Sequence, residues 1–156
     1  VGLQPGSLYN HITTKQELLF DLIHNHMIAL HERIGEALAG ISDPHARLEA
    51  FVAFHLTYHI ERKREVFIGS AELRSLEPKN RKRIIKLRRD YEDILAGILE
   101  RGVAAKKFKV GDVRVSTYAI LAMLTGICTW YAPKGRIDQD ALIKTHMRLV
   151  IQGVEG

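Results

Sequence analysis

Apolar residues recur at helical spacing along almost the whole chain, and this limits what the chain can fold into. From Lys15 to about Ala39 one helix face carries Leu19, Leu22, Ile23, His26, Met27, Leu30, Ile34 and Leu38. The same reasoning predicts further helices over residues 44–64, 65–75, 78–105, 112–132 and 138–153. Because no segment convincingly alternates as a strand does, the sequence predicts an all-α fold.

The composition is that of a soluble globular protein that folds as one body. The chain has 156 residues, of which 46% are hydrophobic and 26% are charged, enough for a substantial core. The net charge of +5 favours an anionic partner only weakly. Cys128 is the only cysteine, so no intramolecular disulfide can form, which fits the reducing cytoplasm. We therefore expect a cytoplasmic protein.

Residues 2–19 predict the turn and recognition helix of a helix-turn-helix, followed by the start of a long helix. Gly2 suits the tight turn, and Pro5 suits the first helical position, where a missing N–H costs nothing. Leu8 and Ile12 are spaced to anchor one helix face. The other face offers side chains that can bond to bases or phosphates: Gln4, Ser7, Tyr9, Asn10 and His11.

Thr14 and Glu17 have the spacing of a capping box, which predicts that the long helix begins there. Lys15 then lies in the first turn, where a helix N-terminus can hold a DNA phosphate, although a solvated lysine is the alternative. The expected DNA-binding residues are Gln4, Pro5, Gly6, Ser7, Tyr9, Asn10, His11 and Lys15.

This stretch resembles the signature of TetR-type transcriptional repressors. The pattern Gly-Leu-x-x-Gly-Ser-Leu-Tyr-x-His-Ile-x-x-Lys-x-Glu-Leu-Leu agrees at many positions, with Ile12 where the family usually has Phe. The resemblance implies a TetR-like helical bundle. Residues 1–39 would be the remnant of the DNA-binding domain plus a connecting helix, and residues 40–156 the ligand-binding and dimerisation domain. Since two supporting helices would precede Val1, we expect the chain to be part of a longer protein.

Two arginines on the long helix after Pro78 suggest a ligand site. Arg81 and Arg88 share a stripe with Ile84 and Tyr91, so their side chains either reach outward or bind an anion. With the Trp-Tyr-x-Pro-x-Gly motif from Trp130, this resembles a TetR subgroup that senses acyl-CoA thioesters of lipid or steroid catabolism; the alternative is a helix end packed by aromatic residues. We expect a pocket lined by Phe51, His55, Tyr58, Phe67, Arg81, Arg88, Tyr91 and Trp130.

Other functions find less support. His55 and His59 have i, i+4 spacing, but without a His-Glu-x-x-His motif or a cysteine partner they predict core or pocket histidines rather than metal ligands. We expect no catalytic residue and no cofactor. Residues 115–133 carry no charge, which a membrane span would need; a helix buried partly against a second subunit is the preferred interpretation. A homodimer through residues 112–132 and 138–153 is expected.

The sequence thus predicts a ligand-responsive repressor that binds operator DNA and is released by a small-molecule effector. The resemblance implies that this effector is an acyl-CoA thioester from lipid or steroid catabolism. The alternative is a small helical lipid-binding protein or enzyme with no role on DNA. Operator sequence, effector identity and the choice between repression and activation stay open at this point.

Overall fold

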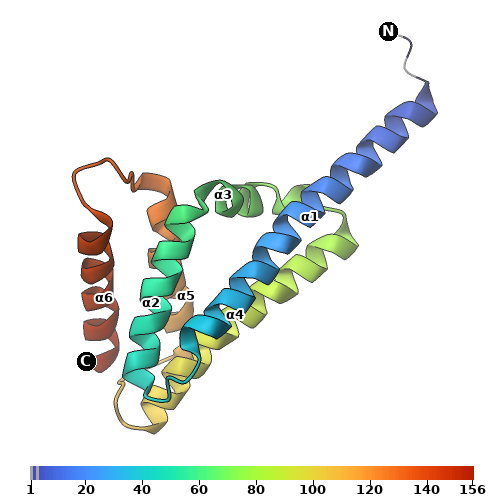
Figure 1. Ribbon diagram of the computed structural model, residues 1–156. Coiled ribbons are helices and arrows are strands. Elements are labelled where there is room, and N and C mark those ends of the chain that lie inside the picture. Colours follow the sequence, from blue (N-terminus) through green and yellow to red (C-terminus); the bar gives the residue numbers. More distant parts are fainter. Residues whose placement is uncertain (1, 3) are drawn as a thin grey trace.

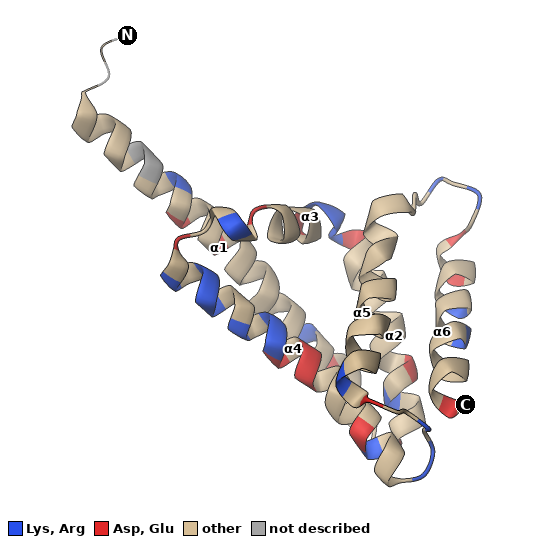
Figure 2. Ribbon diagram, turned by 180° about the vertical axis from the view of Figure 1, so that it is seen from behind, with Lys and Arg blue, Asp and Glu red and all other residues tan. Residues whose placement is uncertain are grey.

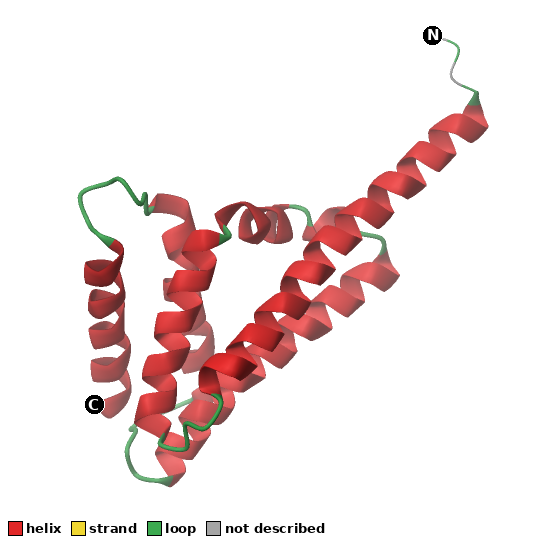
Figure 3. Cartoon of the chain, in the orientation of Figure 1, coloured by secondary structure: helices red, strands yellow, loops and turns green. Residues whose placement is uncertain are grey.

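The computed structural model describes Gly2 and residues 4–156, apart from the side chains of His11 and Ile12. The helices are α1 (Pro5–Leu38), α2 (Pro44–Glu61), α3 (Lys63–Ala71), α4 (Pro78–Ala104), α5 (Val113–Trp130) and α6 (Gln139–Glu155), with a 3-10 turn, η1 (Leu73–Ser75), after α3. Short loops join them, and no strand occurs among the described residues (Figures 1 and 3). The predicted all-α fold is confirmed.

Proline and aspartate define most helix starts, as the sequence predicts. Pro44 and Pro78 occupy the first turns of α2 and α4. The side chains of Asp43, Asp112 and Asp138 each accept a hydrogen bond from the backbone N–H three residues later, and so cap α2, α5 and α6. These contacts satisfy backbone donors that have no partner inside the helix.

The predicted helix start at Thr14 is wrong, because α1 runs without a break from Pro5 through the expected capping box. Instead of capping, the hydroxyls of Thr13 and Thr14 donate to the carbonyls of Tyr9 and Asn10, one turn earlier. With no proline or glycine between Ser7 and Arg33, nothing interrupts the backbone ladder. The two expected helices are therefore one helix of 34 residues.

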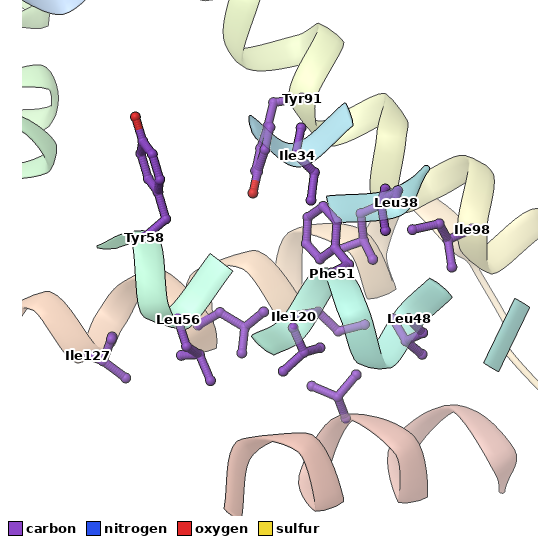
Figure 4. Packing of buried hydrophobic residues seen from close by; sticks show 14 of the residues in the cluster. Ile34, Leu38, Leu48, Phe51, Leu56, Tyr58, Tyr91, Ile98, Ile120 and Ile127 are labelled. Atoms are coloured by element: carbon purple, nitrogen blue, oxygen red, sulfur yellow. The ribbon is translucent and has the colours of Figure 1, made fainter. Parts of the chain in front are cut away.

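Helix α2 lies at the centre of the fold and packs against α1, α4, α5 and α6. Its buried side chains recur at helical spacing and include Leu48, Phe51, Val52, His55, Tyr58 and His59. Figure 4 shows Phe51 beside Ile34 and Leu38 of α1, with Tyr91 of α4 directly above it. Most of the apolar surface of the chain is therefore buried around one helix.

A smaller cluster joins α1 to the start of α4 and is closed by a glutamine. Phe20 and Ile23 of α1 pack with Leu76 and Ile84. Beside them the Gln16 side chain donates to the carbonyl of Ser75 at 2.7 Å and accepts from the backbone N–H of Glu77 at 3.2 Å. We call these two hydrogen bonds the Gln16 clamp. The clamp fastens α1 to the turn between α3 and α4.

Beyond the clamp, the N-terminal part of α1 projects from the body (Figure 1). Leu8 and Tyr9 are both exposed there, with Tyr9 exposed to 74%. Projecting apolar side chains of this size are typical of a surface that meets another element or partner.

The end of α4 depends on the absence of a side chain at Gly102. A Cβ atom at this position would lie 1.8 Å from Cδ2 of Phe108, whose ring is buried against the helix. The backbone N–H groups of Lys107 and Phe108 both donate to the carbonyl of Gly102. The absence of a side chain therefore lets the following loop fold back and bury Phe108.

We predict that Gly102→Ala lowers the free energy of unfolding by about 1–3 kcal/mol, because the new methyl group overlaps the Phe108 ring. Urea unfolding measures the change. Gly97→Ala, in the same helix, is the matched control: its Cβ would lie no closer than 3.4 Å to Arg101, so it should leave stability unchanged or raise it by up to about 1 kcal/mol. Equal effects of the two substitutions would contradict the packing argument.

Candidate functional site: a histidine-lined cavity

A cavity of about 200 Å³ lies between five helices. The predicted site used α2, α3, α4 and α5, and all four contribute to the wall. Helix α1 also contributes. The lining residues are Ile23, His26, Met27 and Leu30 from α1, His55 and His59 from α2, Glu65, Val66, Gly69 and Ser70 from α3, Arg88, Tyr91 and Glu92 from α4, and Leu121 and Thr125 from α5.

Arg88 is the cationic group of the cavity. Its Nη2 donates to the backbone carbonyl of Gly69 at 2.6 Å, which ties α4 to α3. Burial lowers the pKa of Arg88, and Glu92 partly opposes this shift, but a guanidinium stays protonated at neutral pH. No carboxylate among the described residues lies within ion-pair distance of Arg88, so its charge remains available to a ligand anion.

His55 joins three helices through hydrogen bonds. Its Nδ1 lies 3.0 Å from the Tyr91 hydroxyl and its Nε2 lies 3.1 Å from the Thr125 hydroxyl. Burial holds the pKa of His55 well below its ordinary value, with a further lowering from His59, so the ring is neutral. A neutral imidazole has one donor and one acceptor, and hydroxyls can take either role. Both tautomers of His55 are therefore satisfied.

His59 stacks on His55, with ring centroids 3.7 Å apart. Its Nδ1 lies 2.8 Å from the backbone carbonyl of His55. Because a carbonyl can only accept, Nδ1 carries the proton. Burial lowers the pKa of His59 to about 4, although this hydrogen bond raises it, so Nε2 is an unprotonated acceptor at neutral pH. The structure records no hydrogen bond to this Nε2 from the described residues.

Two further polar groups lie beside the cavity without a partner. The Nδ1 atom of His26 and the hydroxyl of Tyr58 are both buried and make no hydrogen bond with the described part of the chain. Their rings lie 5.7 Å apart. Burial lowers the pKa of His26, against the opposing effect of Glu65, and raises the pKa of Tyr58. The His26 side of the cavity therefore favours neutral groups.

Of the eight predicted ligand residues, His55, Arg88 and Tyr91 lie in the cavity wall. Phe51 lies directly beneath it, fully buried against the rings of His55 and Tyr91. The Tyr58 ring points away from Phe51 and Tyr91, and stacks on Phe54 instead (Figure 4).

The other three predicted residues lie away from the cavity, because Phe67 and Trp130 are on other faces of their helices and Arg81 lies further along α4. Phe67 is 71% exposed, while its neighbour Val66 lines the cavity. Trp130 is 57% exposed and stacks on His146 of α6, with ring centroids 6.3 Å apart. Arg81 is half-buried on α4, two helical turns before Arg88.

Sequence reasoning missed the contribution of α1. His26 lies on the predicted apolar stripe of that helix, between Ile23 and Met27, and the polar residue within an apolar face was the available signal. Only the tertiary fold reveals that the stripe leaves the core at this point to form a cavity wall.

The expected DNA-binding residues lie on and before the projecting part of α1. Gln4, Pro5, Gly6, Ser7, Tyr9, Asn10 and Lys15 are exposed, while the side chain of His11 lies outside the described residues. No acidic residue occupies positions 1–16, so no negative charge of this segment opposes an approaching phosphate.

The structure also bears on a metal site, on Cys128 and on a membrane span. Within the described residues no three His, Cys, Asp or Glu side chains form a metal-binding group. Burial raises the pKa of the Cys128 thiol, which contacts the carbonyl of His59 at 3.7 Å. The α5 helix is long and apolar enough to cross a membrane, but one such helix is weak evidence, since core helices pass the same test.

We predict that acidification destabilises the protein through His59. The unfolded chain binds a proton near pH 6.5, whereas the folded ring resists protonation until about pH 4. The stabilising contribution is therefore present above pH 6.5 and is lost as the pH falls toward 4. Between pH 7 and 5 the loss is about 2 kcal/mol for this group. Urea unfolding should show a shallower pH slope for His59→Phe than for the wild type; equal slopes would contradict this assignment.

Comparison with known proteins identifies the family. A family model described as tetracyclin repressor-like, C-terminal domain, matches residues 41–154. The HTH-type transcriptional repressor KstR2 of Rhodococcus jostii is 24% identical over 155 residues, covering 98% of this chain and 76% of that protein. The structure of the TetR family transcriptional regulator PfmR of Thermus thermophilus is 29% identical, with a TM-score of 0.80 over 97% of this chain and 82% of that one. AibR in complex with isovaleryl coenzyme A and operator DNA has a TM-score of 0.81 at 23% identity, over 92% and 78% of the two chains. The chain belongs to the TetR family of transcriptional regulators.

Proposed function

We propose that this protein is a ligand-responsive repressor whose effector is an acyl-CoA thioester with a short acyl group. The observation that carries the proposal is the cavity at the meeting point of α1 to α5, which combines apolar side chains such as Met27, Leu30 and Leu121 with Arg88, whose guanidinium has no carboxylate partner among the described residues. An acyl-CoA has an apolar acyl chain, which suits the apolar part of the wall, and a phosphorylated carrier, which suits the charge of Arg88. The complex of AibR with isovaleryl coenzyme A supports this class of ligand for the same fold.

The size of the cavity limits the acyl group. A volume of about 200 Å³ equals that of about seven water molecules at about 30 Å³ each. A short or branched acyl group fits this space, whereas a long chain or a steroid nucleus requires the helices to move apart. Ser70, at the rim, is exposed, so the carrier can extend from this side into solvent.

Regulation follows from differential affinity. An effector shifts the protein toward whichever arrangement of helices it binds better, and a ligand that binds both arrangements equally changes nothing. Because the cavity wall includes Ile23, His26 and Met27, an effector contacts the same helix that carries the projecting DNA-binding segment. Release of the operator would be the result of that contact.

We predict that Arg88→Ala weakens binding of isovaleryl-CoA or butyryl-CoA about tenfold, since a partly buried charge-assisted contact is lost. Isothermal calorimetry measures the affinity. Arg81→Ala is the matched control, because Arg81 is an arginine of the same helix that does not line the cavity. If the wild type binds none of these thioesters, the proposed effector class is wrong. If both variants bind as the wild type does, the role of Arg88 is wrong.

For DNA, we infer that residues 4–15 carry the contacts. Gln4, Asn10 and their neighbours would meet base edges, while Tyr9, His11 and Lys15 would bond to phosphates. Support comes from the exposure of the described side chains and from the transcriptional repressor among the relatives. Residues 1–39 would then belong to the DNA-binding domain and its connecting helix, and residues 40–156 to the effector and dimerisation domain. Such a regulator acts in the cytoplasm, where the bacterial operator is.

For assembly, we infer a two-fold homodimer through α5 and α6. Figure 2 shows α5 uncharged along nearly its whole length. Val115 and Tyr118 of α5 and Leu149 of α6 are exposed in the single chain. A second copy of the chain would cover these faces with a four-helix contact. Two copies would also present two DNA-binding segments to a palindromic operator.

We predict that Tyr118→Glu combined with Leu149→Glu converts the dimer to a monomer of 17.7 kDa, since two charges per chain would be buried at the contact. Sedimentation velocity at micromolar concentration measures the mass. The same variant should lose operator affinity, whereas Lys15→Ala should stay dimeric, bind all DNA sequences less tightly and reduce the salt dependence. A wild type that sediments only as a monomer would contradict the assembly. Unchanged affinity of Lys15→Ala would contradict the phosphate contact.

A further inference from the structure

We propose that the acyl group of the effector carries a hydroxyl, and that Nε2 of His59 selects it by accepting its hydrogen bond. The inference rests on the proposed function, because it takes the cavity as the acyl site. It goes further by naming a group on the ligand and the residue that recognises it.

The geometry fixes the role of His59. The ring is held by the bond from its Nδ1–H to the carbonyl of His55 and by stacking on the His55 ring. A flipped ring or the other tautomer would break that bond. The lone pair of Nε2 is therefore the acceptor that this side chain presents, and no described residue donates to it.

The two neighbouring histidines do not compete for this role. Both nitrogens of His55 are already paired with the hydroxyls of Tyr91 and Thr125, on two other helices. The Nδ1 atom of His26 has no access to the cavity, being fully buried. Of these imidazole nitrogens, Nε2 of His59 is the one known to be an acceptor, because the proton of the ring is on Nδ1. No described residue donates a hydrogen bond to it.

The chemistry of a buried acceptor decides which ligand group suits it. A hydrocarbon chain would take away the water that can bond to Nε2 and give nothing in return. A carboxylate has no proton to donate to Nε2, and it would add a negative charge to a wall that already carries Glu65 and Glu92. A hydroxyl donates one hydrogen bond and remains neutral. Since Met27, Leu30 and Leu121 form apolar wall nearby, a short hydroxyacyl group matches both parts of the cavity.

The test compares ligands that differ only in one hydroxyl. Calorimetry with butyryl-CoA, 3-hydroxybutyryl-CoA and 4-hydroxybutyryl-CoA keeps the carrier and the chain length constant. We expect the wild type to bind at least one hydroxylated thioester about tenfold more tightly than butyryl-CoA. His59→Phe, which keeps a flat ring without an acceptor, should bind all three with similar affinity.

His146→Phe is the matched control. His146 is buried to the same degree as His59, and its Nδ1 likewise contacts the carbonyl four residues earlier, that of Leu142, at 2.9 Å. It lies on α6, outside the cavity wall. This variant should keep the wild-type preference for the hydroxylated ligand, so loss of the preference in His59→Phe alone identifies the cavity histidine.

A second measurement uses the wild type and does not depend on the folding of a variant. In protein labelled with ¹⁵N at histidine, the hydroxylated ligand should move the Nε2 resonance of His59 toward higher field, and butyryl-CoA should not. Equal affinity of the wild type for all three thioesters would overturn the hydroxyl inference and leave the effector proposal standing. Absence of binding to any of them would overturn both.

Discussion

The burial of α2 among four other helices is the constraint on which the rest of the structure depends. The polar side chains on the buried faces of α2 must find their partners within the protein. His59 therefore donates a hydrogen bond to the backbone of its own helix. His55 forms hydrogen bonds with the hydroxyls of Tyr91 on α4 and Thr125 on α5. Both rings stay neutral because charging them in this position is costly. The cavity beside α2 is consequently lined by neutral histidines on this side, while the other ionisable side chains of its wall, Glu65, Arg88 and Glu92, come from α3 and α4.

The sequence predicted a helix start correctly where contacts between neighbouring residues determine it. Pro44, Pro78 and the capping aspartates mark helix starts through contacts within four residues, and apolar spacing identified the buried faces of α2 and α4. The failure at Thr14 has the same origin. A threonine three residues before a glutamate can cap a helix or bond back inside one, and the choice depends on whether the preceding residues are already helical.

The sequence could predict a residue of the cavity wall only where the apolar face of its helix also lines the cavity. His55, Arg88 and Tyr91 lie on faces that apolar spacing aims inward, so sequence placed them together correctly. Phe67 and Trp130 were included for their aromatic character, but their helices turn them outward. Gly102 shows what sequence reasoning could not reach. A side chain at this position would overlap the ring of Phe108, and only the folded loop brings that ring against the helix.

The Gln16 clamp gives α1 a fixed point between the cavity and the projecting segment. From Met27 in the cavity wall to Tyr9 is eighteen residues, or about 27 Å of helix. Gln16 lies between them, about 17 Å from Met27 and about 11 Å from Tyr9, so a tilt of about 5° about the clamp moves Met27 by about 1.4 Å and Tyr9 by about 1 Å in the opposite direction. The uninterrupted backbone of α1 thus acts as a lever, and its continuity through Thr14 is what allows movement at one end to reach the other.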